Sequence, residues 1–130
     1  MSLLLIMIFM HIVDDYYLQG ILASMKQKSW WQKQETYCDK YKHDYKVALF
    51  MHAFSWTFMI MLPLFFVYEY VYGFQDNIFV DLVFWLNCFV HFTVDDLKAN
   101  EKKINLWQDQ LIHIVQIVIT ALVVPFLYTL

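Results

Sequence analysis

The sequence predicts an all-α integral membrane protein, with four membrane-spanning helices packed as an antiparallel bundle in a single domain over residues 1–130. Three observations support this class. Hydrophobic residues make up 61% of the chain, well above the roughly 45–50% of soluble domains. Charged residues make up only 16%, against about 25% in soluble domains. The two glycines and two prolines leave the apolar stretches almost without breakers.

Four apolar stretches each reach the roughly 20 residues that a helix needs to cross about 30 Å of hydrocarbon. They cover residues 2–23, 45–72, 77–97 and 104–130. We interpret the first as a retained helix and not a cleaved signal peptide, because it lacks a basic start and a small-residue cleavage site. The second contains Pro63, which predicts a kink. In the third and fourth, Asn87 and Gln116 are expected to form hydrogen bonds between helices.

The connections predict the orientation of the chain. Residues 24–44 form the longest connection, which contains Trp30 and Trp31, residues typical of a membrane–water boundary. This loop holds either a short amphipathic surface helix or plain polar chain, and the connection near 73–76 is tight. All lysines lie in or beside the first and third connections: Lys26, Lys28, Lys33, Lys40, Lys42, Lys46, Lys98, Lys102 and Lys103. The positive-inside rule therefore places both connections in the cytoplasm and both termini on the non-cytoplasmic side.

Imidazole and carboxylate groups interrupt the apolar stretches at regular spacing. A charged group inside lipid costs at least about 2.5–3.5 kcal/mol, so their repetition needs a reason. Three stretches carry a His and an Asp four residues apart, on one helix face, and the remaining stretch carries one His. These residues are His11 and Asp15, His52, His91 and Asp95, and Asp109 and His113. On the predicted topology most of these groups lie roughly 5–16 Å from the cytoplasmic boundary, which predicts one layer inside the bundle.

This layer predicts a metal site. Neutral imidazole and carboxylate are ordinary ligands for zinc, manganese and iron, and helical bundles build such sites from pairs on facing helices. We expect one or two divalent metal ions, bound by all seven residues. His52 and Asp109 are also the candidate catalytic residues, with His52 a ligand or a general base. Three alternative roles for the layer stay open: hydrogen bonds that only hold helices together, a proton or ion pathway, and haem ligation by two histidines.

At these residues the chain resembles a family of small polytopic membrane proteins of unknown function from bacteria and their phages. The family pattern is HxxxD followed by LQ, then a single His, then HxxxD with a following Lys, then DQxxH. The matching positions are His11, Asp15, Leu18, Gln19, His52, His91, Asp95, Lys98, Asp109, Gln110 and His113. The resemblance implies a multi-pass protein of the bacterial inner membrane. A looser similarity to membrane-bound metal-dependent hydrolases with His and Asp motifs favours hydrolysis.

Residues and resemblance together predict a metal-dependent hydrolase that acts on a lipid head group or another phosphoester at the cytoplasmic leaflet. A nucleic-acid surface is excluded by the net charge of −3 and the absence of arginine, whose guanidinium clamps phosphate. Two other function classes are kept. One is an ion-conducting, proton-conducting or transport protein that uses the layer as a relay. The other is a non-enzymatic phage protein that binds a host membrane protein. A homo-oligomer is also left open.

Overall fold

The computed structural model describes residues 2–36, 38–73 and 77–129, and every regular element in these ranges is a helix. The predicted all-α class is therefore confirmed. The elements are α1 (Leu3–Ile12), the π-helix η1 (Val13–Leu18), α2 (Leu22–Met25), α3 (Lys28–Gln32), the 3-10 helix η2 (Asp39–Tyr41), α4 (Asp44–Tyr72), α5 (Ile78–Ala99) and α6 (Leu106–Leu127). Residues 74–76 of the expected tight connection and the last residue of the 104–130 stretch lie outside the described residues.

Three helical segments are long and apolar enough to cross a membrane: Asp39–Tyr72, Ile78–Ala99 and Leu106–Leu127. They correspond to the second, third and fourth predicted stretches. Large apolar side chains such as Phe58, Phe89 and Leu122 point outward from them, while His91 and His113 are fully buried. Apolar groups outside and ionisable groups inside reverse the pattern of a helix in a soluble protein, and this arrangement suits a lipid environment.

The N-terminal stretch differs from the prediction, because residues 2–23 do not form one helix. The helix ends at Leu18 and starts again at Leu22. Gly20 lies between them with φ +50°, a left-handed conformation that cannot continue a right-handed helix. The 10 residues of α1 and the 6 of η1 rise about 24 Å, short of the hydrocarbon thickness. Four spans, and the sides assigned to the termini, therefore remain predictions.

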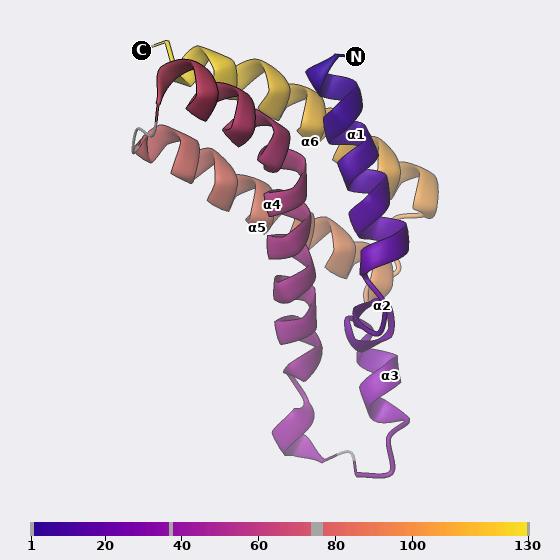
Figure 1. Cartoon of the computed structure of the whole chain (residues 1–130). Helices are drawn as coiled ribbons and strands as arrows, with labels where there is room; N and C mark the ends of the chain where they lie inside the picture. Colours follow the sequence, from indigo (N-terminus) through magenta and orange to yellow (C-terminus); the bar gives the residue numbers. More distant parts are fainter. Residues whose placement is uncertain (1, 37, 74–76, 130) are drawn as a thin grey trace.

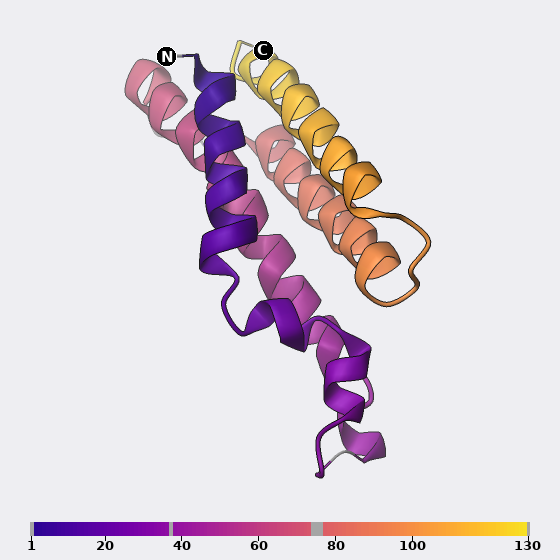
Figure 2. The same cartoon turned by 90° about the vertical axis from the view of Figure 1, so that its right-hand side faces the viewer.

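The long helices pack in a ring, in which α1 and α5 each contact both α4 and α6 (Figure 1). The two termini lie at one end of the ring, and the connections that follow η1 and α5 lie toward the other end (Figure 2). The helix α4 is bent along its length (Figure 1), as Pro63 predicts. The buried apolar core consists of Met7, Trp56, Ile60, Met61, Leu64, Val80, Ile117 and Val124. It fills the half of the bundle nearer the termini, so the polar layer lies in the half nearer the lysine-rich connections.

The connection over residues 24–44 contains the end of α2, the short helix α3 and the 3-10 helix η2. The rings of Trp30 and Trp31 in α3 meet edge to face, with centroids 5.0 Å apart. The Nε1 of Trp31 donates to the carbonyl oxygen of Met25 at 2.7 Å. Together with the first turns of α4, this segment extends beyond the α5–α6 pair (Figure 1). The helices α2 and α3 pack against α4, at the predicted cytoplasmic end.

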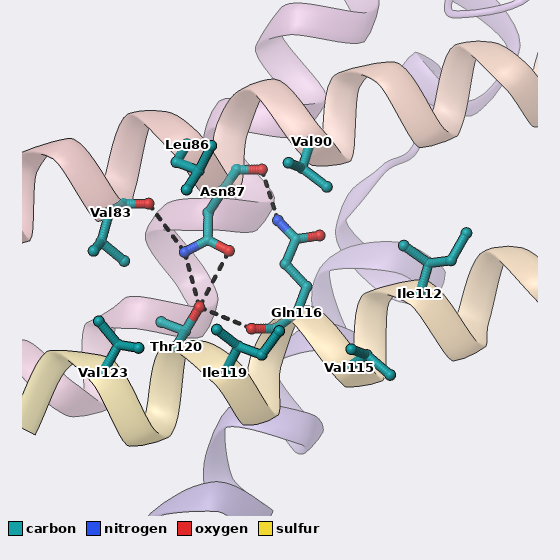
Figure 3. Close-up of a pocket in the computed structure, with 10 residues that line it drawn as sticks. All are labelled: Val83, Leu86, Asn87, Val90, Ile112, Val115, Gln116, Ile119, Thr120 and Val123. Atoms are coloured by element: carbon teal, nitrogen blue, oxygen red, sulfur yellow. Dashed lines mark hydrogen bonds between the residues drawn. The ribbon is translucent and has the colours of Figure 1, made fainter.

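The seam between α5 and α6 carries the hydrogen bonds between helices that the sequence predicts (Figure 3). Asn87 Nδ2 donates to Thr120 Oγ1 at 2.9 Å, and Gln116 Nε2 donates to the carbonyl oxygen of Asn87 at 2.8 Å. These groups border an otherwise apolar groove of about 290 Å³ (Figure 3). Because Asn87 is one turn from His91, and Gln116 is one turn from His113, the network fixes the register of the two histidines.

Candidate metal centre

The structure brings all seven predicted residues together in one cluster between α1, η1, α4, α5 and α6. Each member has a nitrogen or oxygen within 3.5 Å of a polar atom of another member. All except Asp15 are buried, and the Asp15 side chain is only 9% exposed. The members are His11, Asp15, His52, His91, Asp95, Asp109 and His113, and Asp14 joins them through His52.

The π-helix η1 explains why two successive carboxylates face the cluster. Asp14 and Asp15 are adjacent, yet Asp14 is only 1% exposed and both lie within 3.4 Å of His52. A π turn closes through an i→i+5 hydrogen bond and holds more residues than an α turn, so successive side chains diverge less. Asp14 is not among the seven residues that the sequence analysis selects, and no pattern in the sequence signals the π turn.

His52 lies between Asp14, Asp15 and His91. Its Nε2 is 3.1 Å from His91 Nε2 and 3.4 Å from both Asp15 Oδ1 and Asp95 Oδ2. Its Nδ1 is 3.4 Å from Asp14 Oδ2. With the ring hydrogen on Nδ1, toward Asp14, the Nε2 lone pair accepts a hydrogen bond from Gln19 Nε2 at 2.9 Å. His52 Nε2 can therefore bind a metal when the Gln19 amide turns away from it, at a point where His91, Asp15 and Asp95 converge.

Two overlapping triads could each hold a metal ion: Asp15, His52 and His91 in one, and His91, Asp95 and His113 in the other. Within each triad the ligand atoms lie within 4.8 Å of one another. His91 belongs to both, because its Nε2 is 3.1 Å from His52 and its Nδ1 is 3.2 Å from His113. Ligand atoms of a tetrahedral ion with bonds of about 2.0–2.1 Å are separated by about 3.3 Å, so the observed spacing suits a first-row metal.

Two buried atoms at the second triad have no hydrogen-bond partner among the described residues: His113 Nε2 and Asp109 Oδ1. They lie 3.4 Å apart, and Asp95 Oδ1 is 3.5 Å from the same nitrogen. A buried polar atom without a partner is costly. A cation stabilises this convergence of acceptors, and the cation is either a proton on His113 or a metal ion.

His11 lies at the edge of the cluster, outside both triads. The Nε1 of Trp56 donates to His11 Nδ1 at 2.7 Å. Because an indole nitrogen can only donate, the ring hydrogen of His11 is on Nε2, where it donates to Gln110 Oε1 at 3.1 Å. A ligand role for His11, as the sequence predicts, would break one of these bonds. Trp56 also stacks on His91, with centroids 4.1 Å apart, a contact that sequence reasoning missed.

Two lysines form ion pairs with carboxylates of the cluster. Lys26 Nζ is 2.6 Å from Asp95 Oδ2, and Lys98 Nζ is 2.5 Å from Asp109 Oδ2. The Lys26 side chain is 13% exposed and the Lys98 side chain 33% exposed. Lys98 is the lysine that follows the HxxxD motif of His91 and Asp95. Sequence reasoning used Lys26 only for topology, because nothing near it in the sequence points to a carboxylate 69 residues away.

We predict that Asp14 is a positioning residue that orients His52. Its Oδ1 accepts a hydrogen bond from Ser55 Oγ at 2.6 Å, and its Oδ2 faces His52 Nδ1. Asp14→Asn should weaken metal binding by about 10–100-fold, as expected when a carboxylate that orients a metal-binding histidine is lost. Calorimetric metal titration of detergent-purified protein measures this effect.

The control for this prediction is Asp96→Asn, because the Asp96 side chain accepts from Asn100 and belongs to neither triad. Asp96→Asn should leave metal affinity unchanged. Equal affinity in Asp14→Asn and the unsubstituted protein would refute a positioning role. Thermal unfolding of the metal-stripped variants is the second measurement. A variant in which only the orientation of His52 is lost binds metal more weakly but unfolds at the same temperature, whereas a misfolded variant changes in both metal affinity and unfolding temperature.

Comparison with protein-family models, with curated proteins and with solved structures finds no match for this chain. The described residues nevertheless combine apolar helices of membrane-spanning length with buried His and Asp groups that could bind a metal ion. Function is therefore inferred from the chemistry of these side chains.

Proposed function

We propose that the protein is a membrane-embedded metal protein that binds two divalent ions and hydrolyses a lipid or other phosphoester at the cytoplasmic leaflet. The observation that carries this proposal is the pair of triads that share His91, the second of which contains the buried and unpartnered His113 Nε2. The lysine-rich connections favour the cytoplasmic leaflet. Imidazole with carboxylate suits zinc, manganese or iron.

The residues divide between binding and catalysis in this proposal. A bound divalent ion polarises a phosphoryl oxygen and activates water. His52 is assigned as a ligand because its Nε2 lies 3.1 Å from His91 Nε2 and 3.4 Å from Asp15 Oδ1, the other two members of the first triad. Asp109 belongs to neither triad and has an unpartnered oxygen 3.4 Å from His113. We therefore assign Asp109 as the group that accepts a proton from the attacking water.

A metal titration combined with an activity assay tests the proposal. Metal-stripped protein in detergent is titrated with Zn²⁺, Mn²⁺ and Fe²⁺, and bound metal is measured by mass spectrometry after gel filtration. Two ions per chain are expected, with hydrolysis of a chromogenic phosphodiester or of phospholipid only in the loaded protein. A chain that binds none of the three metals would refute the proposal.

A proton relay is the second candidate, because the imidazoles of His113, His91 and His52 form a continuous chain with nitrogen separations of 3.2 and 3.1 Å. Such a chain can pass a proton from ring to ring. Proteoliposomes that hold a pH-sensitive dye distinguish the two candidates. Proton flux that follows the membrane potential and needs no metal favours the relay. Absence of flux, together with stoichiometric metal, favours the hydrolase.

A further inference from the structure

A polar opening adjoins the second triad between α2 and the end of α5. It has a volume of about 270 Å³ and is lined by Lys26, Gln27, Asp95, Lys98 and Ala99. Liquid water occupies about 30 Å³ per molecule, so this volume is large enough for a small polar group. Asp95 is both a wall of this opening and a member of the second triad. A ligand in the opening therefore lies beside the proposed metal ions.

The two ammonium groups of the opening are the only lysines that pair with carboxylates of the cluster in the described part of the chain. Lys26 bonds to Asp95, which belongs to the second triad. Lys98 bonds to Asp109, whose other oxygen faces His113. A metal ion in the second triad is bound by Asp95 and lies beside Asp109, whose Oδ1 is 3.4 Å from His113, so its positive charge weakens the attraction of both carboxylates for the lysines. A partly buried ammonium group that loses its counter-charge requires another anion.

Charge balance identifies the kind of anion. With neutral imidazoles, four carboxylates and two ammonium groups give the cluster a formal charge of −2. Two divalent ions that share His91 through both of its ring nitrogens displace its ring proton, so the charge becomes +1, which the monoanion of a phosphate group neutralises. The groups counted are Asp14, Asp15, Asp95, Asp109, Lys26 and Lys98. Lysine is a common partner for phosphate as a point charge.

We propose that the opening between Lys26 and Lys98 binds the phosphate group of the substrate, and that metal loading creates its affinity by releasing both lysines from their carboxylates. The inference rests on the proposed function, because it needs metal ions in the triads. It adds an order of events: metal binds first, and phosphate then binds between the ions and the lysines. Phosphate and metal therefore strengthen each other's binding, as linkage requires.

Calorimetric titration of inorganic phosphate tests this inference on detergent-purified full-length protein, first metal-stripped and then loaded with Mn²⁺. Phosphate affinity should be about tenfold or more higher in the loaded protein. Because a hydrogen bond to a charged group contributes about 1.5–3 kcal/mol, Lys26→Gln and Lys98→Gln should each lower that affinity about tenfold or more. The matched control is Lys28→Gln, in the same connection as Lys26 and outside the described ion pairs, which should change nothing.

A second arm identifies the source of the phosphate. Loaded protein is reconstituted in phosphatidylcholine vesicles with or without phosphatidic acid before the phosphate titration. A lipid head group as ligand predicts that phosphatidic acid suppresses binding of inorganic phosphate, and a soluble phosphoester predicts no suppression. Both results support the phosphate site and assign its ligand.

Three results would overturn the inference. They are equal phosphate affinity with and without Mn²⁺, full affinity in the Lys26→Gln and Lys98→Gln variants, and an equal loss in Lys28→Gln. Metal content is measured before phosphate is added, so the two proposals fail separately. Protein that binds Mn²⁺ but not phosphate overturns the phosphate site alone. Protein that binds no metal overturns both.

Discussion

His91→Ala is expected to abolish binding of both metal ions, because His91 is the one residue that the two triads share. Its Nε2 faces His52 and its Nδ1 faces His113, at 3.1 and 3.2 Å. Loss of a residue that only supports a ligand lowers metal affinity by about 10–100-fold. Loss of the ligand His91 should lower the affinity for each ion by more than this. Mass spectrometry of the gel-filtered protein should find no bound metal where the unsubstituted protein holds two ions.

Selective variants make this prediction sharper. Asp15→Ala removes a ligand from the first triad only, so it should retain one ion. His91→Gln keeps most of the side-chain volume beside Trp56 and should lose metal as His91→Ala does, which separates ligand loss from a packing defect. His43→Ala is the matched control, since His43 lies in the exposed connection before α4. Equal metal content in His91→Ala and His43→Ala would remove the basis of the metal centre.

The convergence of the cluster followed from the sequence because it depends on two simple regularities. Helix geometry places His91 with Asp95, and Asp109 with His113, on one face whatever the tertiary structure. The lysine distribution then predicts antiparallel helices, and antiparallel helices bring the pairs to one end of the bundle. The interhelical bonds of Asn87 were predictable for a similar reason, since a polar side chain inside lipid needs a partner.

Other features depend on backbone detail or on distant contacts, and the sequence pattern does not encode them. The helix break at Gly20 lies inside an apolar run, so composition alone favoured an uninterrupted span. The π turn that directs Asp14 inward has no signature in residue type. The pairing of Lys26 with Asp95 joins residues far apart in the sequence. Trp56, which contacts both His11 and His91, was indistinguishable from the other aromatic residues.

Asp95→Asn is expected to destabilise the metal-stripped protein by about 3 kcal/mol, at the lower end of the range for breaking a buried ion pair. The substitution keeps the side-chain shape but leaves the Lys26 ammonium without the carboxylate that lies 2.6 Å from it. The lower end applies because the Lys26 side chain is 13% exposed and can extend toward the interface. Chemical and thermal unfolding in detergent measure the loss.

A double-variant cycle separates the ion pair from other roles of Asp95. Lys26→Gln combined with Asp95→Asn removes both charges, so no unpaired ammonium remains and most of the lost stability should return. Asp81→Asn, an exposed carboxylate on the same helix, should have little effect on stability. A double variant no more stable than Asp95→Asn would contradict the prediction, because it would mean that the unpaired Lys26 ammonium is not what destabilises Asp95→Asn. The same double variant should still bind less metal, because Asp95 is a ligand of the second triad whether or not Lys26 is charged.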